Sequence, residues 1–226
     1  MATLDDIARQ LQISKSTVSK ALSGAVDVSE AMRTAALEKA VELGYAPLAR
    51  RGAVRRLALF VTNMRVDTPD DFGYDIMLGF RKMAEPAGYQ VDIIPLTTEM
   101  QQQNRYDTYM MANRYLGGFF MGLSLLDPWI EEFETCTTPT VLYDNHVRKN
   151  PNVAQVAVDS FEGMHLAVEH LKALGHKKIG YLSSALQAYV YQQRYHAFFR
   201  AMDESGMDAS QSLSGSAYHI SECLTH

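Results

Sequence analysis

The stretch SKSTVSKALSG, residues 14–24, decides how the first part of the chain folds. Its apolar residues Val18 and Leu22 are four positions apart, which places them on one face of a helix. Ser14 suits the N-cap position, and Gly24 suits the left-handed position after the last turn. The other side chains are mostly small hydroxyls and lysines, which are poor material for a core. The stretch therefore predicts a short helix that buries one face and presents a polar, basic face outward.

Two more short helices are predicted on either side of this stretch. Thr3 and Asp6 form a capping-box pair in front of apolar residues at helical spacing. Residues 12–13 then leave room for only a tight turn. Ser29 is the N-cap of a third helix, which ends near Gly44. Its predicted buried stripe comprises Met32, Ala36, Leu37, Ala40 and Leu43. Three helices with a tight turn between the first two predict a helix-turn-helix unit.

Charge is distributed unevenly along the chain. The net charge is -5, yet residues 1–56 carry nine Lys/Arg and six Asp/Glu, which leaves -8 for the rest. A basic head on an acidic body suggests that only the head meets a polyanion. Small residues let a helix enter the major groove, and lysines reach base edges or phosphates. The pattern favours DNA binding, with chance clustering and a solvated, packing-only helix pair as the alternatives.

Several short motifs stand in order over the first 47 residues. D-I-A and S-x-x-T-V-S-[RK]-x-L occur in TLDDIARQLQISKSTVSKALSG, and V-S and L-G-Y-x-P occur in VSEAMRTAALEKAVELGYAP. This arrangement closely resembles the headpiece of the lactose-repressor (LacI/GalR-type) family of bacterial transcription regulators. The resemblance implies base reading by Lys15, Ser16 and Lys20. It implies phosphate contacts by Ser14, Thr17, Ser19 and Ser29. The family usually has arginine where Lys20 stands, and lysine lacks the bidentate fork for guanine, so an altered operator preference is implied.

The segment LARRGAVRR, residues 48–56, is predicted to be a basic linker. In the resembling family this region forms a hinge helix whose leucine enters the minor groove. Here Gly52 stands in place of that leucine, and the segment is shorter than usual. Glycine costs about 1 kcal/mol of helix stability relative to alanine, and it has no side chain to act as a wedge. Arg50 and Arg51 can still contact phosphates. An ordered hinge helix and a flexible basic tether both stay open.

From Leu57 onward the pattern changes to alternating strands and helices. Strands are predicted at 57–61, 89–96, 117–123, 139–144, 153–158 and 177–184, and helices at 74–87, 101–113, 128–134, 160–174 and 189–205. Such alternation predicts a right-handed, doubly wound parallel α/β sheet. The order resembles the periplasmic-binding-protein-like (type I) sensor core of the same family. The most specific stretch is VDSFEGMHLAVEHLKALGHKKIGYLS, residues 158–183.

The predicted organisation has three parts. Residues 1–47 form the headpiece, residues 48–56 the linker, and residues 57–226 an effector-binding and dimerisation core. This core divides into an N-lobe at about 57–150 and a partial C-lobe at about 151–226. Only 170 residues follow the linker, which is fewer than the family's two-lobed sensor needs, so the C-terminal lobe is expected to be incomplete. Uncovered strand edges and apolar surface predict poor solubility or non-native association.

Five residues are candidates for effector binding. Ligands of open parallel sheets bind beyond the carboxyl ends of the strands, which is where Asn63, Asp144 and Asp159 are expected. Phe72 is expected in the loop after the first strand. The resemblance matches Arg194 to an effector-contacting arginine, Asp144 to an acidic residue that contacts sugar hydroxyls, and Phe72 to a stacking position. A capping role for Asp159 and a core role for Phe72 stay open.

Several other classes of protein lack support in the sequence. No apolar run approaches the ~20 residues of a membrane span, and the N-terminus has no signal-peptide pattern. The two cysteines form neither a disulfide framework nor a metal spacing, and the histidines have no metal-ligand spacing. Nucleophile-elbow and phosphate-loop motifs are also missing. We therefore expect a cytoplasmic protein with no catalytic residues, no metal, no cofactor and no membrane partner.

These observations predict a homodimeric transcription regulator, a repressor, that binds palindromic double-stranded operator DNA. Its activity would be controlled by a small-molecule effector, a sugar or related metabolite, bound between the sensor lobes. A dimer is expected because one headpiece reads only a half-site. The alternative is a soluble small-molecule-binding protein with a non-functional headpiece, which the unusual linker motivates. An enzyme of doubly wound fold is the remaining alternative, and no catalytic motif supports it.

Overall fold

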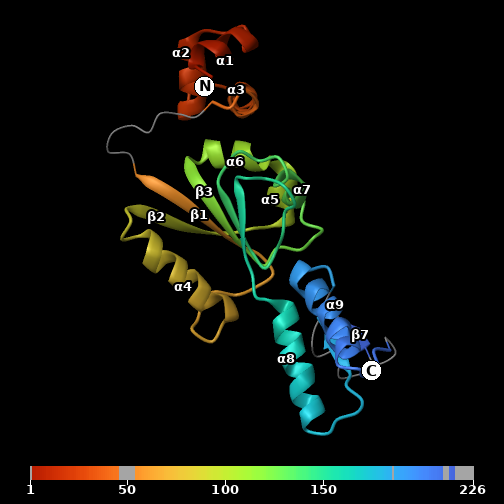
Figure 1. Cartoon of the computed structure of the whole chain (residues 1–226). Coiled ribbons are helices and arrows are strands. Elements are labelled where there is room, and N and C mark those ends of the chain that lie inside the picture. Colours follow the sequence, from red (N-terminus) through yellow and green to blue (C-terminus); the bar gives the residue numbers. More distant parts are fainter. Residues whose placement is uncertain (1, 46–53, 185, 211–213, 217–226) are drawn as a thin grey trace. The chain divides into compact units, whose positions relative to one another are not determined.

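A computed structural model describes residues 2–45, 54–184, 186–210 and 214–216 of the chain (Figure 1). The chain divides into two compact units. The first unit comprises Met1–Met121, Asp127–Val141 and Val147–Ala154, and the second comprises Gly122–Leu126, Leu142–His146 and Gln155–His226. The linker residues Arg50, Arg51 and Gly52 lie outside the described residues. The predicted lobe boundaries at about 57–150 and 151–226 stay predictions.

The headpiece consists of the three predicted helices. They are α1 (Leu4–Leu11), α2 (Lys15–Ser23) and α3 (Glu30–Glu42). Their shared core comprises Ile7, Ala8, Val18 and Ala40, with Leu4, Leu11, Ile13, Leu22 and Leu43 packed against it. Ile7, Val18 and Ala40 are completely buried. The predicted helix-turn-helix arrangement is confirmed.

Each headpiece helix begins at the N-cap that the sequence predicts. Thr3 and Asp6 form a complete capping box. The Ser14 hydroxyl accepts the Thr17 backbone N–H at 3.1 Å, and the Ser29 hydroxyl accepts the Met32 N–H at 3.3 Å. These hydrogen bonds satisfy backbone donors that the first turn of a helix leaves unpaired. Local hydrogen bonding thus fixes where α1, α2 and α3 start.

A parallel sheet organises the part of the chain after the linker. Its strands are β1 (Arg55–Val61), β2 (Tyr89–Pro95), β3 (Tyr115–Met121), β4 (Thr140–Tyr143) and β5 (Val153–Val156). They lie in the order β2-β1-β3-β4-β5, and β1 pairs in parallel with both β2 and β3. The helices between these strands are α4 (Phe72–Ala84), α5 (Thr98–Gln103), α6 (Tyr106–Ala112) and α7 (Trp129–Glu132). The predicted parallel α/β architecture is confirmed.

The two faces of β1 and β3 are covered by different helices, as Figure 1 shows. On one face, Phe80 of α4 stacks on Phe119 with ring centroids 4.9 Å apart. On the other face, the Trp129 ring lies edge-on to Phe60 at 5.6 Å. Tyr106, Phe120 and Phe133 complete this second aromatic cluster and are fully buried. Alternate strand residues point to opposite faces, which is why neighbouring phenylalanines serve separate cores.

The single helix predicted at 101–113 is wrong, because two helices are present. The chain is extended at Asn104, between α5 and α6. The Asn104 carbonyl accepts a 2.7 Å hydrogen bond from the Trp129 indole N–H. A partner that is 25 residues away in the sequence therefore stabilises the break. The strand predicted at 177–184 is also shorter than expected and runs only from Tyr181 to Ser183.

The second unit is built around two long helices. They are α8 (Ser160–Ala173) and α9 (Tyr189–Glu204), accompanied by the parallel pair β6 (Tyr181–Ser183) and β7 (Ser214–Ser216). Val168, Ile179, Phe198, Ala201 and Met202 form its core. Leu166, Leu174 and Leu182 are each more than 60% exposed. The predicted tendency to associate stays a prediction, and these exposed leucines are its structural basis.

Two features are absent from the described residues. No helix among them has both the length and the apolar character that a membrane crossing requires. The same residues contain no group of three or more His, Cys, Asp or Glu side chains placed to hold a metal ion.

Candidate nucleic-acid interface and effector pocket

Helix α2 separates a buried face from an exposed polar face. Val18 and Ala21 are buried in the headpiece. The exposed residues of the helix include four predicted DNA contacts, namely Lys15, Ser16, Ser19 and Lys20. Because α2 is anchored by its apolar side, this polar face is held outward on a folded scaffold.

Three hydroxyls gather at the N-terminus of α2. The Ser14 hydroxyl lies 2.7 Å from that of Ser16 and 2.8 Å from that of Thr17. Helix N-termini and hydroxyl groups both favour phosphate oxygens, since the first backbone N–H groups point outward and carry partial positive charge. This end of α2 has the chemistry expected of a phosphate contact.

We expect Ser14→Ala to destabilise α2, because the variant loses the hydroxyl that accepts the Thr17 N–H. Loss of such a cap lowers helix stability by about 1 kcal/mol. Denaturant unfolding combined with hydrogen exchange of the α2 amides measures the change. Ser19→Ala is the matched control, because Ser19 is exposed in the middle of the same helix. If both variants exchange alike, the cap does not stabilise α2.

Both candidate base-reading lysines are paired with carboxylates. Lys15 Nζ lies 2.7 Å from the Asp5 carboxylate, and Lys20 Nζ lies 2.5 Å from that of Asp27. The hydrogen bond from Lys20 lowers the pKa of Asp27 below its ordinary value. All four side chains are more than half exposed. Water screens such surface pairs, so a phosphate or base edge can replace the carboxylate.

The first unit holds two of the predicted effector residues. Asn63 follows β1, as expected, and has a left-handed backbone with φ of 53°. The prediction that Phe72 lies in a loop is wrong, because it is the first residue of α4. Its side chain is 69% exposed, which also excludes a core role. Asp71 precedes the helix and accepts the backbone N–H groups of Asp67 and Thr68, which orders the preceding turn.

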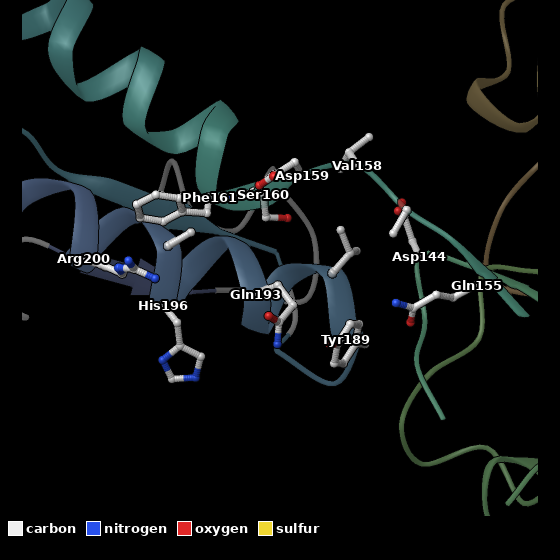
Figure 2. Close-up of a pocket in the computed structure, with 13 residues that line it drawn as sticks. Asp144, Gln155, Val158, Asp159, Ser160, Phe161, Tyr189, Gln193, His196 and Arg200 are labelled. Atoms are coloured by element: carbon white, nitrogen blue, oxygen red, sulfur yellow. Dashed lines mark hydrogen bonds between the residues drawn. The ribbon is translucent and has the colours of Figure 1, made fainter. Parts of the chain in front are cut away.

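The second unit contains a pocket of about 350 Å³ (Figure 2). Two predicted effector residues, Asp144 and Asp159, line it. Arg194 was predicted to join them, but it is not a lining residue. The arginine that lines the pocket is Arg200, which lies on the same helix. The other lining residues include Gln155, Phe161, Tyr189, Gln193 and His196.

Asp144 is the most unusual carboxylate of this pocket. Burial raises its pKa, although a hydrogen bond from the Val158 backbone and the charge of Arg194 oppose the shift. Its buried Oδ1 has no hydrogen-bond partner within the described part of the chain. Like Asn63, it has a left-handed backbone, with φ of 55°. A desolvated carboxylate oxygen with unused acceptor capacity is suited to bind a ligand hydroxyl or N–H group.

Asp159 has a structural role in addition to lining the pocket. It is the N-cap of α8, and its Oδ1 accepts the backbone N–H groups of Phe161 at 3.0 Å and Glu162 at 2.9 Å. The capping alternative for this residue is therefore confirmed. Its place in the pocket leaves the second carboxylate oxygen as the one that could face a ligand.

Sequence reasoning missed the residues that α9 contributes to the pocket. Tyr189, Gln193, His196 and Arg200 recur at helical spacing and share one face of α9. Arg200 lies over the Phe161 ring at 4.1 Å and forms a 2.9 Å ion pair with Glu204. Arg194 is one position after Gln193, so it points about 100° away around the helix. A helical-wheel analysis of 189–200 would have separated the two arginines.

The geometry places the chain in the class of proteins that join a helix-turn-helix headpiece to a parallel α/β core. Residues 3–47 match the family model described as bacterial regulatory proteins of the lacI family. The headpiece of this chain is therefore similar to that family of regulatory proteins.

Named relatives extend the likeness beyond the headpiece. The HTH-type transcriptional repressor PurR of Aliivibrio salmonicida is 26% identical over 215 residues, which is 93% of this chain and 63% of that protein. The ribose operon repressor of Halalkalibacterium halodurans is 25% identical over 98% of this chain and 65% of that protein. The chain thus spans less than two thirds of the length of these relatives.

Solved structures share the fold of this chain. The transcriptional regulator CelR–cellobiose complex superposes with a TM-score of 0.59 and 22% identity, over 96% of this chain and 65% of that one. The lac repressor dimer bound to operator and the anti-inducer ONPF gives a TM-score of 0.54 and 19% identity, over the same two fractions. At these identities the likeness establishes the fold alone.

Proposed function

We propose that this chain supplies the DNA-reading part and part of the sensor of a cytoplasmic transcription regulator, a repressor. The observation that carries the proposal is the exposed polar face of α2, with Lys15 and Lys20 on a helix whose other side is buried. The named relatives of this family support it, because they are repressors.

In the proposed complex, α2 lies in the major groove. Lys15, Ser16 and Lys20 read base edges, and the two lysines exchange Asp5 and Asp27 for DNA acceptors. Phosphate contacts come from hydroxyls at helix N-termini and from linker arginines. These residues are Ser14, Thr17, Ser19, Ser29, Arg50 and Arg51. The operator is a palindrome bound by a homodimer, because two-fold protein symmetry matches two half-sites.

The proposed effector contacts come from residues of both units. Asp144, Asp159, Asn63, Phe72 and Arg194 are the proposed contacts, and a sugar or related metabolite is the proposed ligand. Arg194 does not line the pocket, but its charge acts on Asp144, which supports keeping it in the set. The unused acceptor of Asp144 supports hydroxyl binding, and one solved relative is a cellobiose complex. Effector binding and operator binding would be linked through one conformational equilibrium.

Selection of the chain's preferred sequence from a pool of palindromic DNA, followed by fluorescence anisotropy at two salt concentrations, tests the proposal. We expect one palindrome to be enriched. Lys20→Ala should weaken binding to it by about 1–3 kcal/mol, or roughly 5–150-fold, and relax the preference at one base pair of each half-site.

Arg9→Ala is the charge-matched control for this test. It removes one exposed cation from α1 of the same headpiece, so it should lower affinity without changing the preferred base. Weak binding that salt abolishes, with no preferred sequence, would contradict the proposal. That outcome would favour the alternative, a small-molecule-binding protein with a non-functional headpiece.

A further inference from the structure

Arg56, the second residue of β1, holds three strands together at their amino ends. Its Nε donates to Asp92 Oδ2 of β2 at 2.8 Å, and Nη2 lies 2.5 Å from the same oxygen. Nη2 also donates to the Tyr115 hydroxyl of β3 at 3.2 Å, and Nη1 donates to the Asn113 carbonyl at 3.0 Å. We call Arg56, Asp92, Asn113 and Tyr115 the strand-start clamp.

The strand-start clamp is partly shielded from water and electrostatically matched. The side chains of Arg56 and Asp92 are only 35% and 23% exposed. Burial by itself would raise the pKa of Asp92, but hydrogen bonds from Gln90 and Arg56 outweigh burial and lower it below its ordinary value. The carboxylate therefore stays ionised and paired at neutral pH. The guanidinium also lies over the Tyr115 ring, 4.7 Å from its centroid.

Backbone pairing is regular on only one side of the strand start, because β1 pairs with β2 in continuous register from Arg55, whereas its pairing with β3 is irregular. The register between β1 and β3 shifts between Arg56 and Ala58, so regular pairing resumes only at Ala58. A bulge of this kind interrupts the ladder of hydrogen bonds. Side-chain contacts from Arg56 bridge the interruption. Without them, the pairing with β2 would be the main contact that holds the first residues of β1 in the sheet.

These contacts change the assignment of the basic linker. By sequence, Arg55 and Arg56 belong to the basic segment 48–56, in which Arg50 and Arg51 are the predicted phosphate contacts. In the structure both are in the sheet, where Arg55 pairs in register with Tyr89 and its guanidinium lies 3.9 Å from the Tyr89 ring centroid. The clamp thus marks an anchored point of the sensor at the start of the residues that the structure describes after the linker.

We propose that the strand-start clamp sets the distance between the two DNA half-sites that the regulator accepts. This inference rests on the proposed function, in which two headpieces read a palindrome. The covalent length between the headpiece and the first anchored sensor residue limits how far each headpiece can reach, at about 3.3–3.6 Å per residue. One base pair rises about 3.4 Å. Each residue released from β1 therefore extends the reach by about one base pair.

The experiment measures binding to a series of operators that share the selected half-sites and differ in the spacer between them by single base pairs. We expect the wild-type chain to have a sharp optimum. Arg56→Ala should broaden this optimum toward longer spacers, because a longer connection tolerates a wider span. The ratio of the affinity for the optimal operator to the affinity for an operator two base pairs longer should fall by about fivefold or more. Asp92→Asn, which removes the partner's charge, should shift the profile in the same direction.

Tyr106→Phe is the matched structural control. It removes a buried 2.7 Å hydrogen bond to Thr140 in the same unit and leaves the strand start intact, so it should lower stability without changing the spacing profile. Arg56→Lys, which keeps the charge and loses the planar fork, should be intermediate. Arg56→Lys replaces Arg56→Ala in the experiment if the alanine variant does not fold.

Three outcomes would overturn the inference. Spacing profiles of wild type and Arg56→Ala that coincide would show that the clamp does not set the reach. An equal broadening by Tyr106→Phe would assign the effect to general destabilisation. If the slope of log affinity against log salt concentration changes in Arg56→Ala by the equivalent of about one released counterion, while the spacing optimum is unchanged, Arg56 would instead be a phosphate contact. If the wild type selects no palindrome at all, the proposed function itself fails, and the inference fails with it.

Discussion

Ile7→Ala is expected to unfold the headpiece and abolish sequence-selective DNA binding. Ile7 is completely buried at the centre of the α1–α2–α3 core. Removing such a side chain lowers stability by about 2–5 kcal/mol. The headpiece has only about 45 residues, so it buries too little surface to tolerate that loss easily. Loss of amide protection in α1, α2 and α3, measured by hydrogen exchange, should accompany the loss of selective binding.

Val26→Ala is the control for this variant. It also shortens an aliphatic side chain of the headpiece, but Val26 is fully exposed, so both protection and DNA binding should stay close to wild type. The amides of β1 and β3 should remain protected in both variants. Selective DNA binding by an Ile7→Ala chain whose headpiece amides are unprotected would contradict a role for the folded headpiece in recognition.

Trp129→Ala is expected to cause the largest loss of stability in the α/β part of the first unit. The Trp129 ring contacts Phe60, Tyr106, Tyr109 and Phe120, and its side chain is completely buried. Replacing it leaves a cavity and removes the donor to the Asn104 carbonyl, for a combined loss of about 3–5 kcal/mol. The midpoint of denaturant unfolding, followed by far-UV circular dichroism, should fall accordingly.

Met83→Ala provides the comparison for Trp129→Ala. Met83 is 78% exposed on α4, so its truncation should change the midpoint little. Protection of the headpiece amides should be the same in both variants, since α1, α2 and α3 have their own core. A Trp129→Ala midpoint equal to that of Met83→Ala would contradict the central place of the aromatic cluster.

The local features of the headpiece could be predicted from the sequence. The caps at Thr3, Ser14 and Ser29 depend on hydrogen bonds to residues three positions away, so a short window contains both partners. The outward face of α2 follows from helical spacing alone. The parallel sheet was predictable for a similar reason, because alternating strand and helix patterns admit few arrangements.

Features that depend on distant partners could not be predicted. The break at Asn104 depends on the indole of Trp129, and the sheet role of Arg56 depends on Asp92 and Tyr115. No pattern near Arg56 distinguishes it from a linker arginine. The exchange of Arg194 for Arg200 in the pocket has another origin, since the rotation of α9 about its axis is set by its packing against α8.

The left-handed backbone at Asn63 and Asp144 has a consequence for how the proposed effector site could evolve new specificities. Asparagine and aspartate adopt this conformation more readily than other residues with side chains, and β-branched residues adopt it poorly. Drift or directed evolution at these two positions should therefore explore a narrow set of amino acids, whichever ligand is selected for. New specificities should arise more often from substitutions on α9, where the regular helical backbone of residues 189, 193, 196 and 200 admits almost any side chain.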